Sequence, residues 1–235
     1  MKILKKLLVR IILLILTVGI VCGSVVAVLG YFMYRDALKE QSLEDRVAEV
    51  QANPSYTTLA ELPDIYLEAV VAVEDHRFRQ HCGIDIIAIA RATWNNIKSW
   101  SLREGGSTIT QQLAKNLYFT QEKVLTRKAA EAFMAWAIEK QYTKDEILEL
   151  YVNSIYFGSG YYNVRQASEG YFGKAPAQMT PYECTLLAGV PNAPSAYDPA
   201  QNPGLARQRQ KKVVEQMVER GCLSAAQARE ALTPG

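Results

Sequence analysis

A dense group of ionisable side chains occupies residues 73–83. Two adjacent carboxylates, Glu74 and Asp75, are followed by two histidines and two arginines, directly after the apolar run Tyr66 to Val73. Burial against that run would raise the pKa of a carboxylate, whereas the arginines would lower it. A base adjusted in this way towards neutral pH suits proton abstraction. The alternative interpretation is a solvated helix end whose acids and bases pair with one another.

Residues 105–112 combine two glycines with three hydroxyl side chains at the start of a predicted helix. Free backbone N–H groups and the helix dipole favour phosphate at such a position. Lys115 follows Gln111 one turn later on the same face, which favours an anion-binding interpretation. The alternative is an ordinary helix start, because Ser and Thr cap helices in many proteins.

Arg127 and Glu131 are spaced i, i+4 and therefore share one face of a predicted helix. They either pair with each other on the surface or present a second carboxylate together with its cation. Between Arg77 and Lys128 the sequence has nine basic residues against three acidic ones. That local excess suits an anionic ligand, although scattered basic residues are often solvated helix faces.

The elements that must position these residues are predicted to be helices, and no segment alternates as a strand does. The helix over residues 123–141 carries Ala129, Phe133, Trp136 and Ala137 on one apolar face. Capping residues and turn signals set the boundaries of the other elements. We predict helices at 37–50, 63–72, 86–94, 108–118, 123–141, 144–155, 182–190 and 205–220, and a short one after Ser224.

The N-terminal segment predicts a membrane anchor. No residue from Ile11 to Tyr34 is charged, and this run exceeds the roughly 20 residues that a spanning helix needs. No convincing signal-peptide cleavage site precedes Tyr34. Four basic residues precede the run, whereas charges of both signs follow it, so the positive-inside rule places the N-terminus in the cytoplasm and the remainder outside. The preceding residues are Lys2, Lys5, Lys6 and Arg10.

The chain therefore divides into a cytoplasmic tail (1–10), a transmembrane helix (11–34), a juxtamembrane linker (35–58) and one domain (59–235). Removing the four basic residues of the tail from the 26 Lys and Arg leaves 22, against 24 Asp and Glu, so a nucleic-acid partner is not indicated. The four cysteines form neither a disulfide framework nor a zinc pattern.

Together, and in this order, five segments resemble the peptidoglycan glycosyltransferase (transglycosylase) family, found in bifunctional penicillin-binding proteins and monofunctional transglycosylases. They are Glu74-Asp75-x-x-Phe78-x-x-His81-x-Gly83, Gly105 to Gln112 with Lys115-Asn116, Arg127-Lys128-x-x-Glu131, Lys144 to Asn153, and Tyr171-Phe172-Gly173-Lys174. The match covers residues 59–232. The resemblance implies a mainly α fold, in which a transmembrane helix precedes a lysozyme-like helical head with a smaller membrane-associated jaw.

The resemblance also implies an activity and its partners. The enzyme would polymerise lipid II, the undecaprenyl-pyrophosphate-linked disaccharide-pentapeptide, into glycan strands. Its partners would be lipid II, the growing glycan chain and the bilayer, with other cell-wall synthesis proteins as an option. One base and no covalent nucleophile would give inversion of an α-linked pyrophosphate to a β-linkage.

The matched positions imply site roles. Glu74 would be the general base, with Asp75 orienting the site, and Glu131 would be a second carboxylate near the pyrophosphate. A divalent cation, Mg²⁺ or Mn²⁺, is an option at Glu131, and no other cofactor is implied. The remaining matched residues would bind substrate, with phosphate held by Lys115, Lys123 and Arg127. The others are His81, Gly106, Ser107, Thr108, Gln111, Gln112, Asn116, Lys128 and Asn153.

The sequence departs from the family pattern at one place and leaves alternatives open. Asn163 stands where many relatives have glycine, and Arg165 stands where they have an acid.

No Ser-x-x-Lys or Lys-Thr-Gly motif is present, so we expect a monofunctional enzyme, with a shortened bifunctional one as the alternative. A glycan hydrolase and an inactive scaffold are the rival functions. A hydrolase would need neither a membrane-bound substrate nor a cluster of phosphate-binding cations.

Overall fold

The computed structural model describes residues 2–99, 105–119 and 124–234. The described residues form helices joined by turns and contain no strand, which confirms the expected mainly α class. The helices are α1 (Lys2–Glu40), α2 (Leu43–Gln51), α3 (Asp64–Glu74), α4 (Ile86–Ser99), α5 (Ile109–Tyr118), α6 (Leu125–Gln141), α7 (Lys144–Val152), α8 (Val164–Phe172), α9 (Pro181–Gly189), α10 (Pro203–Glu219) and α11 (Ala225–Ala231). Short 3₁₀ turns lie at Leu59–Glu61, Phe78–Gln80, Pro176–Gln178 and Val190–Asn192.

Local capping explains most of the helix starts. Thr108, Thr143, Thr180 and Ser224 each form a reciprocal capping box at the start of α5, α7, α9 and α11. Some of the predicted boundaries were wrong. The 37–50 stretch is split, because Ser42 caps a separate α2, and α7 ends at Val152 rather than Ile155. α3 extends beyond the predicted Ala72, which brings Glu74 into its last turn.

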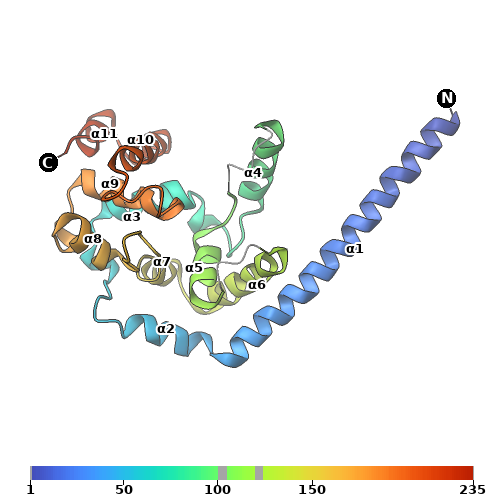
Figure 1. Cartoon of the computed structure of the whole chain (residues 1–235), viewed down its shortest axis with the longest axis horizontal. Coiled ribbons are helices and arrows are strands. Elements are labelled where there is room, and N and C mark those ends of the chain that lie inside the picture. The colour runs from blue at the N-terminus through green and yellow to red at the C-terminus, as the bar shows by residue number, and fades with distance from the viewer. Residues whose placement is uncertain (1, 100–104, 120–123, 235) are drawn as a thin grey trace.

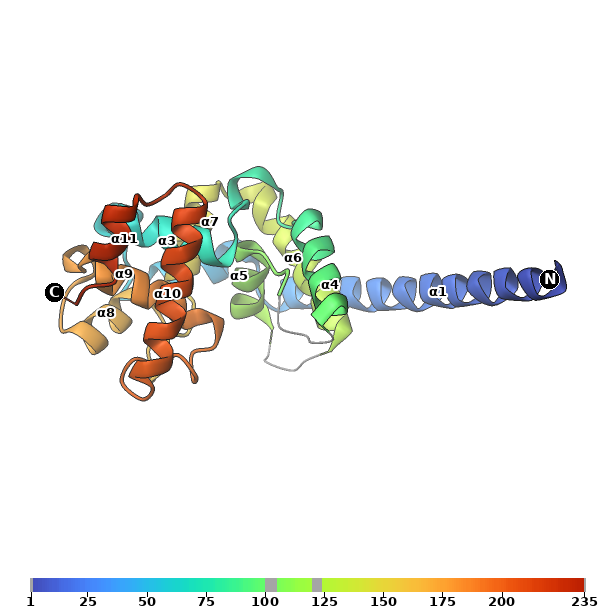
Figure 2. The same cartoon turned by 90° about the horizontal axis from the view of Figure 1, so that it is seen from above.

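Helix α1 projects from the body of the molecule (Figures 1 and 2). Its residues Leu4–Glu40 have the length and composition of a membrane span, and an 18-residue stretch within them has a mean hydropathy of 2.9. The end of α1 packs closely on α6, because a Cβ atom on Gly30 would come within 2.4 Å of the Ala129 Cβ. Tyr31 also stacks edge-on against Phe133. The apolar face predicted for α6 therefore faces α1 and not the core of the domain.

Side chains of α3, α5, α7, α9 and α10 form most of the buried core. These helices lie on the side of the molecule away from the free end of α1 (Figure 1). Tyr66, Phe78, Leu113, Met134 and Tyr151 are fully buried there. α4 stands apart, with Ala92 as its one buried residue. Its exposed side chains include large apolar groups, namely Ile86, Ile87, Trp94 and Ile97. The proposed domain boundaries remain predictions.

Candidate active site

Glu74, the last residue of α3, holds a carboxylate that is only 7 % exposed. Gln112 Nε2 donates a hydrogen bond of 2.7 Å to Oε2. Oε1 has no hydrogen-bond partner among the described residues, and the nearest ion-pair partner is Arg209 Nη2 at 3.8 Å. Burial raises the pKa of Glu74, and this outweighs the opposing effects of Gln112 and Arg209. The site thus contains a carboxylate with one fixed and one open oxygen, as a general base requires.

The orientation of Gln112 is fixed from the other side. The hydroxyl of the fully buried Tyr151, on α7, donates to Gln112 Oε1 at 3.2 Å. Because the carbonyl oxygen of the amide is engaged in this way, its NH₂ group faces Glu74. Three helices distant in sequence therefore position the Glu74 carboxylate.

Asp75 connects the first motif to the start of α5. Its carboxylate accepts hydrogen bonds from His81 Nε2 at 2.9 Å and from the Ile109 backbone N–H at 3.1 Å. Burial raises the pKa of Asp75, and His81 opposes that change. The neighbouring Asp85 pairs with Arg77 and caps α4 by accepting from the Ala88 N–H. These contacts are those expected of residues that orient the site.

Glu131 is completely buried in α6 and meets a cation at each oxygen. Arg127 Nε lies 2.9 Å from Oε1, an ion contact whose angle is too poor for a hydrogen bond. Lys128 Nζ donates to Oε2 and also to Ser107 Oγ, the latter at 3.0 Å. The i, i+4 pair predicted from sequence is thus formed, but it is buried and has a third member.

Lys115 links the two carboxylates electrostatically. It is half-buried on α5, and burial lowers its pKa, while Glu131 and Glu74 oppose the change. Arg127 and Lys128 act in the same direction as burial, which means that Lys115 shares one positive cluster with them. Lys123, predicted to join this cluster, lies outside the described residues.

A divalent cation does not fit the donor atoms present. Both Glu131 oxygens already face basic side chains. Among the described residues, one group of three potential ligands lies close enough together, formed by Asp75, His81 and Asp85. Asp75 is engaged by His81, and Asp85 is engaged by Arg77. Since Mg²⁺ and Mn²⁺ need accessible oxygen ligands, no step below depends on a metal.

Three of the predicted substrate-binding residues have structural contacts instead. Thr108 and Gln111 cap α5 reciprocally, and Thr108 Oγ1 donates to the Gly83 carbonyl at 2.6 Å. Asn153 is 6 % exposed, and its amide donates to the Thr57 carbonyl and accepts from the Thr57 N–H. The structure therefore does not bring Asn153 to the cluster around Glu74.

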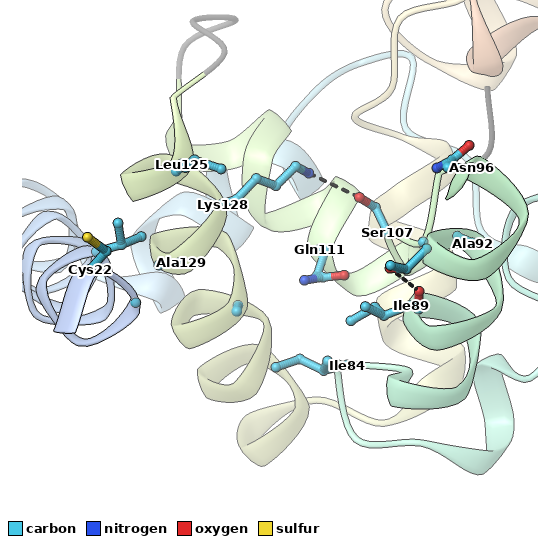
Figure 3. Close-up of a pocket in the computed structure, with 15 residues that line it drawn as sticks. Cys22, Ile84, Ile89, Ala92, Asn96, Ser107, Gln111, Leu125, Lys128 and Ala129 are labelled. Carbon is cyan, nitrogen blue, oxygen red and sulfur yellow. Dashed lines mark hydrogen bonds between the residues drawn. The ribbon is translucent and has the colours of Figure 1, made fainter. Parts of the chain in front are cut away.

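An apolar groove of about 680 Å³ runs between α1, α4 and α6 (Figure 3). Gly106 and Gln111 line it together with the Lys128–Ser107 pair, which bridges α6 and the start of α5 in the close-up. The rest of its wall is mostly apolar. The apolar lining includes Val26, Ile84, Ile89, Ala92, Leu125, Ala129 and Ala132.

Two polar pockets meet near Glu74. The first, here the lysine pocket, has a volume of about 630 Å³ and is lined by Gln112, Lys115, Asn116, Tyr156 and Tyr162, among others. The second, here the arginine pocket, has a volume of about 430 Å³ and includes Glu74 with His76, Arg91, Arg209 and Arg220. Asn192 lines both pockets. Glu74 and its partner Gln112 thus lie where the two pockets adjoin.

The family model described as transglycosylase matches residues 40–218. The chain belongs to the transglycosylase family. A candidate transglycosylase of Cupriavidus necator is 41 % identical over 210 residues, covering 89 % of both chains. Penicillin-binding protein 1A of Neisseria lactamica is 45 % identical over 177 residues, or 75 % of this chain and 22 % of that protein. The chain therefore spans about a fifth of this longer relative.

A solved structure is also similar to the transglycosylase chain. The crystal structure of penicillin-binding protein 1A from Haemophilus influenzae aligns over 77 % of this chain and 17 % of its own, with 22 % identity and a TM-score of 0.46. Family membership identifies the protein as a glycosyltransferase of peptidoglycan synthesis.

The two departures from the family pattern have local explanations in this transglycosylase. Asn163 is the N-cap of α8, where its side chain accepts from the Gln166 N–H. Arg165 pairs with Glu61 at 2.8 Å. Asn163 therefore stabilises the start of α8, and Arg165 connects α8 to the turn that contains Glu61.

Sequence reasoning missed Arg209. It lies on α10 and supplies the ion pair to Glu74, with a side chain that is 15 % exposed. The sequence offers no spacing signal for this contact, because 135 positions separate the two residues. Sequence analysis also gave no sign that Tyr151 orients Gln112.

Proposed function

We propose that this transglycosylase polymerises lipid II into β-1,4-linked glycan strands, with Glu74 as the general base. The observation that carries the proposal is the open Oε1 of Glu74, a buried oxygen without a hydrogen-bond partner among the described residues. Such an oxygen has an unused capacity to accept a proton from a substrate hydroxyl that reaches it. Family membership supports the reaction class.

The chemical step begins at the acceptor sugar. Its 4-hydroxyl gives a proton to Glu74 Oε1 while its oxygen bonds to the anomeric carbon of the growing chain. The bond from that carbon to the pyrophosphate breaks, and its electron pair leaves with undecaprenyl pyrophosphate. Direct displacement inverts the α-linkage to β. Gln112 keeps the other Glu74 oxygen in place during this step.

The leaving group needs positive charge fixed in advance. Lys115, Arg127 and Lys128 supply it, and the buried Glu131 keeps the last two in position. Because Lys128 also reaches Ser107 beside the apolar groove, a lipid-linked phosphate fits at that point with its hydrocarbon chain along the groove. Lys123 is proposed as a further phosphate ligand on the basis of its motif position.

The membrane arrangement follows from the same elements. α1 crosses the bilayer with its N-terminus in the cytoplasm, and the exposed Ile86, Ile87, Trp94 and Ile97 of α4 contact lipid. A reporter that works only outside the cytoplasm, fused to the C-terminus, should be active. Activity of a cytoplasm-only reporter at the same position would contradict this orientation.

The function is tested with detergent-solubilised protein and labelled lipid II. Appearance of a polymer of repeating disaccharides supports the proposal. Digestion of finished glycan without use of lipid II would indicate a hydrolase. Binding of lipid II without either product would indicate a scaffold.

A further inference from the structure

The arginine pocket contains more positive charge than the proposed reaction uses. Arg91 comes from α4, Arg209 and Arg220 come from α10 and its C-cap, and His76 follows α3. The α4 side and the α10 side of the arginine pocket therefore each contribute guanidinium groups next to Glu74.

Two of these arginines lack acidic partners. Within the described part of the chain, no carboxylate pairs with Arg91 or Arg220. Arg220 donates hydrogen bonds to the carbonyl and to the side chain of Gln216. Burial, and then the nearby Arg91, lowers the pKa of Arg220, and burial with Arg220 and Arg91 lowers that of His76. The positive groups are therefore close enough to repel one another, and a bound anion would relieve that repulsion.

The position of the arginine pocket indicates that it binds the acceptor substrate. The unpaired Oε1 of Glu74 is the oxygen near Arg209, a residue that lines the arginine pocket, whereas Oε2 is bonded to Gln112, a residue that lines the lysine pocket. A hydroxyl that gives its proton to Oε1 approaches from the arginine side. Under the proposed function that hydroxyl belongs to lipid II, and the growing chain leaves its pyrophosphate at Lys115.

Lipid II carries two kinds of anion, the pyrophosphate and the carboxylates of its peptide stem. The pyrophosphate is tied to the bilayer, and the apolar groove with Lys128 and Ser107 lies along α1. In both views α10 lies on the side of the domain away from the free end of α1 (Figures 1 and 2). The planar fork of arginine matches the geometry of a carboxylate.

We infer that the arginine pocket binds carboxylate groups on the peptide stem of the acceptor lipid II, so that the enzyme recognises the stem as well as the sugar. This inference rests on the proposed function. Arg91 and Arg220 would then determine whether the enzyme prefers a stem with free carboxylates, and they would take no part in the proton transfer.

The test crosses enzyme variants with substrate variants. Wild type, Arg220→Gln and Arg91→Gln are assayed on lipid II with its native stem, with amidated stem carboxylates, and without a stem. On the native substrate each variant should lose about 10-fold in kcat/KM, the scale of a charge-assisted hydrogen bond. On the stemless substrate the variants should match wild type. Arg207→Gln, an exposed change on α10 outside the pocket, is the matched control.

Each outcome has one meaning. Equal losses on native and stemless substrates would assign the pocket to the pyrophosphate and overturn the inference, as would the absence of any loss. Both arginines keep much of their surface exposed, although Arg220 is partly covered, so the variants should keep the wild-type Tm, which is measured alongside. If wild type polymerises lipid II but the losses of the variants do not depend on the stem, the inference alone is refuted. If wild type uses no form of lipid II, the proposed function is refuted too.

Discussion

Glu74 and Glu131 are both buried carboxylates that act on Lys115, but their partners differ. Glu131 is in contact with two cations from its own helix, at i−4 and i−3. Glu74 has one neutral amide donor and an arginine 3.8 Å away. The charge of Glu131 is therefore compensated locally, whereas burial penalises the charge of Glu74 and raises its pKa.

This difference separates two uses of a buried acid. A carboxylate that is paired on both oxygens holds its partners in place and has little capacity to take a further proton. A carboxylate with a vacant oxygen and a raised pKa can accept one at a useful pH. The comparison supports the proposal that Glu74 takes the proton and that Glu131 positions positive charge.

The largest effect is expected from Glu74→Gln. The amide keeps the size of the side chain but cannot accept the proton, so polymerisation of lipid II should fall by about 10²-fold or more. Circular dichroism and Tm should show a folded protein. Wild-type turnover by this variant would remove Glu74 from the mechanism.

Glu131→Gln should mainly reduce stability. The change removes the carboxylate that is buried against Arg127, a residue only 9 % exposed, and breaking a buried pair costs about 3 to 5 kcal/mol. Denaturant unfolding measures the loss. Asp145→Asn provides the control, because its ion pair with Arg79 is exposed and should contribute less than about 1 kcal/mol. Equal losses in the two variants would mean that the Glu131 pair is no stronger than a surface pair.

The pH profile of Glu131→Gln tests which of the two carboxylates is the general base. In wild type the rate should rise with pH as Glu74 ionises, and the raised pKa places this limb above the ordinary value of 4.5. Glu131→Gln should lower the rate at every pH but retain the ascending limb. Loss of the ascending limb in Glu131→Gln would mean that Glu131, and not Glu74, is the general base.

The smallest effect concerns stability, and its sign is informative. Folding protects the protonated form of Glu74, so wild type loses stability as pH rises from the ordinary value of 4.5 through the raised pKa. Glu74→Gln has no charge to bury and should be slightly more stable than wild type above that window, and equal to it below. A variant that is less stable at high pH would show that Arg209 compensates the carboxylate fully.

The sequence alone determined features that depend on neighbours within about one helical turn. Thr143 and Thr180 predicted helix starts because a hydroxyl and an acid three residues later satisfy backbone groups directly. The Arg127–Glu131 contact followed from i, i+4 spacing. The apolar N-terminal run predicted α1 from its length and lack of charge. The motif order identified the family, because each motif keeps its own residue types.

The tertiary structure decided which of these elements meet. Nothing near Glu74 in the sequence indicates that Gln112 occupies one of its oxygens or that Arg209 approaches the other. The apolar face of α6 gave no sign that it packs against α1 through Gly30. Asn153 matched a motif, yet it is held by Thr57, 96 positions earlier. Such contacts depend on how separate helices pack, and the pKa of Glu74 depends on that packing, because burial and distant charges are properties of the assembled fold.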